Sequence, residues 1–142
     1  MALELVYEGL LSGLKNIAQA DFADASVSIV PGRICCLSSV AGEVVFTGLL
    51  AGTSTDLTPF GLVADYKEDG IASGKVSVYL NGQYMSDQIT GSISRGDMLS
   101  FDDDGILKAA SKGEWIVGIC TEEEDDAGFI ELVLNIAGIV KA

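Results

Sequence analysis

Residues 31–48 read PGRICCLSSVAGEVVFTG, and residues 95–113 repeat this pattern as RGDMLSFDDDGILKAASKG. The segments that follow are also alike: PFGLVADYKEDG and GKVSVYLNG after the first copy, WIVGICTEEEDDAG and FIELVLNIAG after the second. Internal repetition sets the architecture of a chain, so it is weighed before any local motif. The sequence therefore predicts a compact β body made of two related units. The aligned landmarks are Gly32 with Gly96, Ala41-Gly42 with Asp104-Gly105, Gly61 with Gly118, and Val76-x-Val78-x-Leu80 with Ile130-x-Leu132-x-Leu134.

The apolar residues of both units come in short runs between glycine-rich turns. Turn signals every 8–12 residues or so are typical of a β barrel or sandwich. The pair Asn81-Gly82 is typical of a type I′ hairpin turn. The predicted fold class is therefore all-β, a small barrel or sandwich. Strands are expected at residues 34–40, 44–46, 59–66 and 76–80 in the first unit, and at 98–101, 106–109, 115–120 and 129–136 in the second.

The 142 residues are expected to form one globular body with an N-terminal extension. Residues 1–26 mix strand-like and helix-like periodicity, and we interpret them as an arm or edge segment. Residues 27–142 form the duplicated β body, with units at about 27–82 and 92–138. We expect Tyr84, Ile89 and Ile93 to lie in the connection between the units.

The charge of the chain excludes several classes of partner. Asp and Glu number 21 against 8 Lys and Arg, so the net charge is −13. A field of this sign repels nucleic-acid phosphates and anionic membrane surfaces. No run reaches the roughly 18 apolar residues of a membrane helix, and the N-terminus lacks the basic start of a signal peptide. Neither nucleic acid nor a membrane is expected as a partner.

The residues available for catalysis point away from an enzyme. The chain has no histidine, which is the commonest general base. Cys35 and Cys36 should point to opposite faces of a strand, and neither has a partner that would lower its pKa. The three cysteines, with Cys120, lack metal-binding spacing and are expected to be reduced structural thiols. We expect no catalytic residues, no cofactor and no metal.

Two acidic runs leave alternatives open. Asp102-Asp103-Asp104-Gly105 resembles the start of a calcium loop, but its spacing differs from an EF-hand, and a hairpin tip is the simpler interpretation. The run from Glu122 to Asp126 is either a solvated loop or a contact with a basic partner surface. A calcium- or carbohydrate-binding β module therefore remains an alternative function.

The order of the landmarks resembles that of head-decoration, or cement, proteins of tailed bacteriophages. The resemblance covers roughly residues 27–136, and its carriers are glycine-punctuated turns of moderate specificity. The carriers are PFGLVADYKEDG, VSVYLNGQY, ISRGDMLSFDDDG, IVGICTEEEDDAG and FIELVLN.

The resemblance implies a virion structural protein with a β-barrel or β-tulip fold and no catalytic residues. Such proteins are made in the host bacterial cytoplasm, are commonly homotrimers, and bind the outside of the capsid, where the major capsid protein is their partner. A tail or baseplate structural protein is the nearest alternative. An arm could add a strand to a neighbouring sheet edge. The candidate contact residues are Val6, Tyr7, Leu10 and Leu11 in the arm, and Glu122, Glu123 and Glu124 in the acidic run.

Overall fold

The computed structural model describes residues 17–22, 29–46, 57–64 and 75–136. Every regular element within these ranges is a β-strand, which confirms the predicted all-β class. The described residues contain no helix of the length and apolar character needed to cross a membrane. The strands are β1 (Ile17–Phe22), β2 (Ile34–Leu37), β3 (Glu43–Val45), β4 (Pro59–Val63), β5 (Lys75–Tyr79), β6 (Asn81–Ser86), β7 (Met98–Phe101), β8 (Leu107–Ala109), β9 (Gly118–Glu122) and β10 (Ile130–Asn135).

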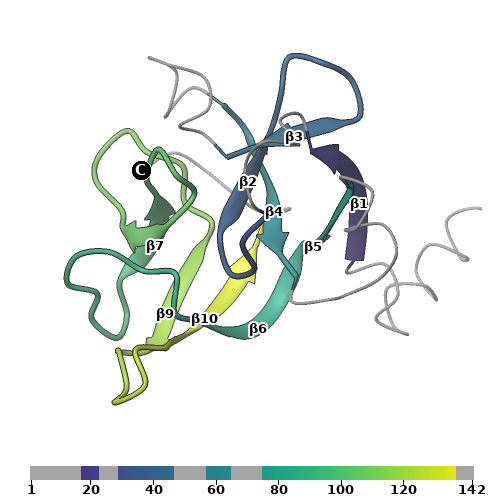
Figure 1. Cartoon of the computed structure of the whole chain (residues 1–142). Helices are drawn as coiled ribbons and strands as arrows, with labels where there is room; N and C mark the ends of the chain where they lie inside the picture. Colours follow the sequence, from purple (N-terminus) through teal and green to yellow (C-terminus); the bar gives the residue numbers. More distant parts are fainter. Residues whose placement is uncertain (1–16, 23–28, 47–56, 65–74, 137–142) are drawn as a thin grey trace, which may run out of the picture.

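The strands form two sheets that lie side by side (Figure 1). The first is a closed barrel with the order β1-β3-β2-β4-β5, and the second has the order β6-β10-β9-β7-β8. The chain passes from the barrel into the second sheet at Leu80, which alone separates β5 from β6. Most predicted strands are found, although the one expected at 115–120 begins at Gly118 instead.

The hairpin predicted at Asn81-Gly82 is wrong. Both residues belong to β6 and pair with β10, where Asn81 lies opposite Asn135 and Gly82 opposite Leu134. Tyr84, expected in a connection between the units, lies in the same strand. An Asn-Gly pair favours a turn only locally, and here a ladder of six residue pairs with a distant strand supplies the backbone hydrogen bonds instead.

The N-terminal prediction is also corrected for part of its range. Residues 17–22 are neither an arm nor an edge, because β1 pairs with β5 on one side and with β3 on the other. A closed barrel leaves no strand with unpaired backbone groups, and β1 is the strand that closes this one. Residues 1–16 and 23–28 lie outside the described part of the chain.

The sheet topology supports the predicted duplication and moves its boundaries. The order β3-β2-β4-β5 in the barrel recurs as β8-β7-β9-β10 in the second sheet. In addition, the antiparallel pairing of β1 with β5 in the barrel corresponds to the antiparallel pairing of β6 with β10 in the second sheet. The parallel pairing of β1 with β3 has a counterpart in an isolated parallel bridge between Ile89 and Leu107 of β8. Each unit therefore begins with its own first strand, at residue 17 and at residue 81.

The aligned landmarks make matching hydrogen bonds in the two units. The N–H of Gly32 donates to the carbonyl of Val63 at 2.9 Å, and that of Gly96 donates to the carbonyl of Cys120 at 2.7 Å. In return, the N–H of Val63 donates to the backbone carbonyl of Arg33, and the N–H of Cys120 donates to the backbone carbonyl of Asp97. These contacts show that the repeat seen in the sequence is a repeat of backbone geometry.

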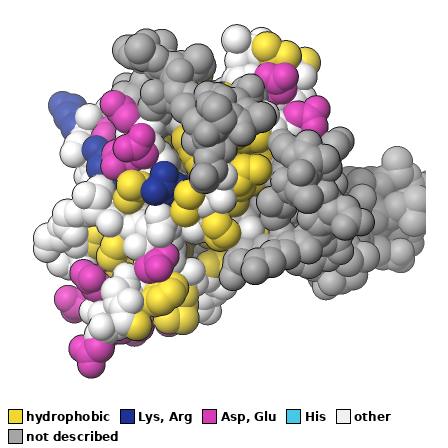
Figure 2. Space-filling model, viewed as in Figure 1, with side chains coloured by type: hydrophobic (Ala, Val, Ile, Leu, Met, Phe, Trp, Pro, Cys, Tyr) yellow, Lys and Arg dark blue, Asp and Glu magenta, His cyan; other side chains and the backbone are white. Residues whose placement is uncertain are grey.

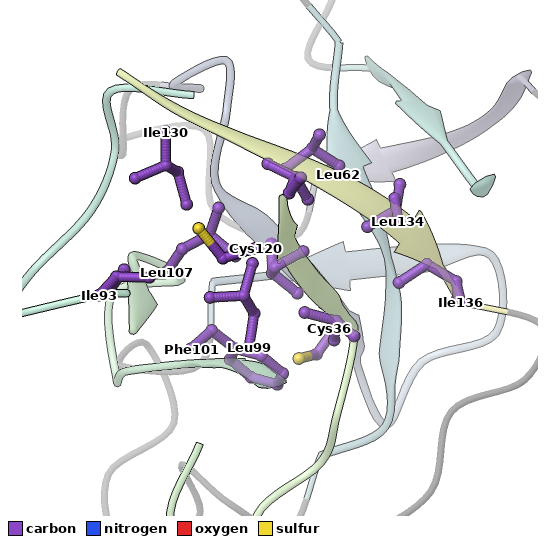
Figure 3. Packing of buried hydrophobic residues seen from close by; sticks show 13 residues of the cluster. Cys36, Leu62, Ile93, Leu99, Phe101, Leu107, Cys120, Ile130, Leu134 and Ile136 are labelled. Carbon is purple, nitrogen blue, oxygen red and sulfur yellow. The ribbon is translucent and has the colours of Figure 1, made fainter. Parts of the chain in front are cut away.

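The buried side chains form two clusters. One fills the barrel interior, where Cys35 packs with side chains such as Val44 and Val78. The other lies between the sheets and places Cys36 and Leu62 of the barrel among side chains of the second sheet (Figure 3). The outer face of the barrel is thus covered by the inner face of the second sheet. Cys35 and Cys36 point to opposite faces of β2, as predicted.

Candidate functional site

The second sheet carries an exposed row of apolar side chains on its outer face. Met98 on β7 pairs with Ile119 on β9, and Ile119 pairs in turn with Val133 on β10. Their exposed fractions are 54%, 46% and 42%. Met85 on β6, two residues from the partner of Val133, lies diagonal to it and is 57% exposed. We call these four residues the outer row.

Strand alternation explains why this row faces outward. Successive residues of a strand point to opposite faces, and Leu99, Cys120 and Leu132 occupy the buried face of the same three strands. A half-buried antiparallel sheet ordinarily presents polar residues to water. The outer row departs from that pattern, and contiguous exposed apolar side chains are typical of protein–protein contact surfaces.

Carboxylates border the outer row. Glu131 shares the outward face of β10 with Val133 and lies opposite Glu122 of β9. Burial raises the pKa of the Cys120 thiol, and the nearby carboxylates of Asp97, Glu123 and Glu122 raise it further. Acidic and hydrophobic side chains lie next to each other around the β9–β10 end of the molecule (Figure 2). The surface thus combines an apolar centre with a negative border.

The structure places some of the predicted contact residues and not others. Glu122, Glu123 and Glu124 are exposed at and just beyond the end of β9, so the acidic run reaches the border of the outer row. Val6, Tyr7, Leu10 and Leu11 lie outside the described residues.

Sequence reasoning missed the outer row itself. A signal for it was present in the sequence. The segments IELVLN and GICTE carry apolar residues at positions that face both sides of the strand, whereas a half-buried strand needs apolar residues on one side only.

The two acidic loops share one local structure, in which an aspartate holds the turn. The Asp102 carboxylate accepts hydrogen bonds from the N–H groups of Asp104 at 2.9 Å and Ile106 at 3.0 Å. Asp125 accepts in the same way from residues 127 and 129, both at 2.9 Å. The third residue after each aspartate is a glycine with positive φ, at 79° and 87°. This geometry matches the hairpin-tip interpretation of Asp102–Gly105, because the carboxylate serves its own backbone.

Other features of the described residues offer little for chemistry. No group of three or more Cys, Asp or Glu side chains in the described ranges is arranged to hold a metal ion. The three thiols are buried, and burial raises the pKa of Cys35 to about 12. Burial also raises the pKa of Cys36, so both thiols stay protonated at neutral pH.

A cleft of about 490 Å³ opens between the two sheets. The rings of Tyr79 and Tyr84 stack in its lining with centroids 4.4 Å apart. The Ser86 hydroxyl donates to the carbonyl of Gly32 at 2.9 Å, and Arg33 Nε donates to Gln88 Oε1 at 3.0 Å. These hydrogen bonds connect Gly32 and Arg33 of the first unit to Ser86 and Gln88 of the second. We therefore interpret the cleft as part of the contact between the two units.

Comparison with known proteins adds a likeness in structure. No family model matches the chain, and no curated protein is significantly similar to it. Among solved structures, it is similar to the head fiber gp8.5 N base of bacteriophage phi29, with a TM-score of 0.46 and 17% sequence identity. The match covers 84% of this chain and 93% of that one.

Proposed function

We propose that this chain is a non-enzymatic structural protein of a bacteriophage virion that binds the outside of the capsid and stabilises contacts between capsomers. The observation that carries the proposal is the outer row, an apolar surface on a paired sheet that a partner protein would cover. The landmarks of the sequence resemblance also support it, since they coincide with the turns and hydrogen bonds of the repeated unit.

A binding role suits the chemistry of the chain better than catalysis does. Histidine is absent from the sequence, and the thiols are buried with raised pKa values. The polar groups named in the cleft are engaged with one another. The described residues thus offer a surface for a partner and no activated nucleophile.

The proposed mechanism is multivalent binding. A decoration protein that touches two capsomers makes its second contact intramolecular, so individually weak contacts add to firm attachment. We propose the major capsid protein as the partner and a homotrimer as the bound form. A trimer would present three copies of each contact surface to the capsid, although the surface of each single chain stays the same.

Co-sedimentation tests the proposal. Purified chain is mixed with expanded capsid shells that lack it, and native mass is measured on the same sample. We expect saturable binding at a fixed ratio to the major capsid protein, by a trimer. A monomer that stays in the supernatant at all concentrations would contradict the proposal.

The arm residues need a separate variant, because residues 17–22 are part of the barrel and cannot be removed with the arm. We expect the double substitution Leu10→Asp, Leu11→Asp to weaken capsid binding at least tenfold if the arm contacts the capsid. The melting temperature serves as the control for folding. Undiminished binding by this variant would exclude these two residues as contacts.

A further inference from the structure

Three residues of the outer row, Met98, Ile119 and Val133, have apolar counterparts in the first unit. Leu62 follows Gly61 as Ile119 follows Gly118, and Leu62 pairs with Ile34 on one side and Tyr79 on the other. In the second unit, Ile119 pairs with Met98 and Val133 in the same arrangement. The two rows therefore occupy equivalent positions in the repeated fold. The equivalent pairs are Ile34 with Met98, Leu62 with Ile119, and Tyr79 with Val133.

The two rows differ in what covers them. Ile34 is 0% exposed and Leu62 is 2% exposed, because the inner face of the second sheet packs against them. Met98 and Ile119 are about half exposed, since no third unit follows in the described chain. The fold thus covers one copy of the row internally and leaves the equivalent copy open.

We infer that the outer row is the docking face for a different protein, one that presents an apolar centre with lysine or arginine at its border. This inference deepens the proposed function and rests on it for the partner being a virion protein. The burial of Ile34 and Leu62 shows that the repeated unit tolerates, and in one copy uses, coverage at this position.

A second copy of the chain is a poor occupant for this face. The surface that covers the first row is the interior of the second unit, and in every copy that interior is engaged with its own barrel. A second copy that docked here through the same face would also bring its own acidic border against this one, and the facing carboxylates would repel each other.

The charges around the row favour a basic partner. Glu131 lies directly opposite Glu122 across β9 and β10, and like charges in cross-strand pairs are destabilising. Asp97, which precedes Met98, adds a third carboxylate near the same strands. Within the described ranges, none of these three carboxylates is in an ion pair with lysine or arginine. A cation from a partner would relieve the repulsion and add attraction as it binds.

Site-specific photo-crosslinking tests the inference. The full chain carries benzoylphenylalanine at position 119 and is irradiated in the cells that naturally produce it. The expected product joins it to one protein other than itself, through a peptide that contains lysine or arginine. The same crosslinker at position 40, which is exposed in the β2–β3 turn outside the row, should not capture that protein.

Charge variants make the test specific to the proposed chemistry. The double substitution Glu122→Gln, Glu131→Gln should lower the yield of the crosslink at least tenfold. The matched control is Asp103→Asn, Asp104→Asn, which removes two exposed carboxylates at the other acidic loop and should leave the yield unchanged. A crosslink to a second copy, the lack of any crosslink, or a yield insensitive to the first pair would overturn the inference. Each of these results is independent of whether the chain sediments with capsids.

Discussion

At Gly118, and at the equivalent Gly61, a neighbouring strand approaches too closely for any side chain. A Cβ at Gly118 would lie 2.4 Å from the carbonyl oxygen of Val133, and one at Gly61 would lie 2.6 Å from Cγ2 of Val78. The alignment of these glycines in the sequence therefore has a packing reason. In both units, the paired strand (β5 beside Gly61, β10 beside Gly118) lies too close for a Cβ at the glycine.

Gly118→Ala is expected to destabilise the protein by about 3 kcal/mol, since the obstructing atom is backbone and has little room to yield. Urea denaturation measures this difference. The control is Gly91→Ala, where a Cβ meets nothing within 4 Å and only the φ of +71° opposes it, at a cost of about 1 kcal/mol. Equal costs for the two variants would contradict the packing argument.

The buried thiols predict a loss of stability at high pH. The pKa of Cys35 is raised by burial from 9.0 to about 12, so the unfolded chain releases this proton at lower pH than the folded chain. The stability that this thiol contributes is therefore complete below pH 9 and falls as the pH rises toward 12, by about 1.4 kcal/mol per pH unit. Thermal melts at several pH values should show a shallower decline for Cys35→Ala. An identical decline for the two proteins would assign it to other groups.

At the scale of elements, the acidic hairpin tips are held by one aspartate each. Asp102 accepts two backbone hydrogen bonds, whereas its neighbour Asp103 is exposed. We expect Asp102→Ala to lower stability by about 1–2 kcal/mol, because two backbone N–H groups lose their partner. Asp103→Ala should change it by less than about 0.5 kcal/mol.

Calcium distinguishes the two interpretations of this loop. Thermal melts of the parent chain and both variants are compared with and without added calcium. If the loop is a hairpin tip, calcium leaves all three melting temperatures unchanged. A calcium-dependent rise in the parent that both variants lose would instead favour the ligand-binding alternative.

At the scale of the whole molecule, the cluster between the sheets makes the two units depend on each other. Leu62 is buried between them, and Trp115 packs against the same cluster from the second unit. We expect Leu62→Ala to cost about 3 kcal/mol and to lower the unfolding midpoints of both sheets together. Trp115 fluorescence reports the second unit, and amide exchange in β2 and β4 reports the barrel. The control is Val40→Ala in an exposed turn. Separate midpoints for the two probes would show that the units fold independently.

The parts of the fold that were predictable depend on local pattern. The hairpin at Asp104-Gly105 and the opposite orientations of Cys35 and Cys36 follow from turn chemistry and strand alternation, and both are found in the structure. The interpretation of Asn81-Gly82 failed because the partner of β6 is some fifty residues away in the sequence. The candidate contacts Glu122–Glu124 were predictable as exposed charge, but their nearness to Ile119 and Val133 depends on strand register.

The sequence by itself determined the all-β class, the repeated order of turns and strands, and the positions that alternate between two faces. These properties follow from turn chemistry and side-chain periodicity, which act over a few residues. Only the tertiary structure decided that β1 closes the barrel, that the chain runs straight through Asn81-Gly82, and that the row of Ile34 is covered while the equivalent row of Met98 is open. Those outcomes depend on which distant strands pair and on which sheet packs against which. Equivalent apolar residues in the two repeats look alike in the sequence, so the sequence does not indicate which copy a neighbouring sheet will cover.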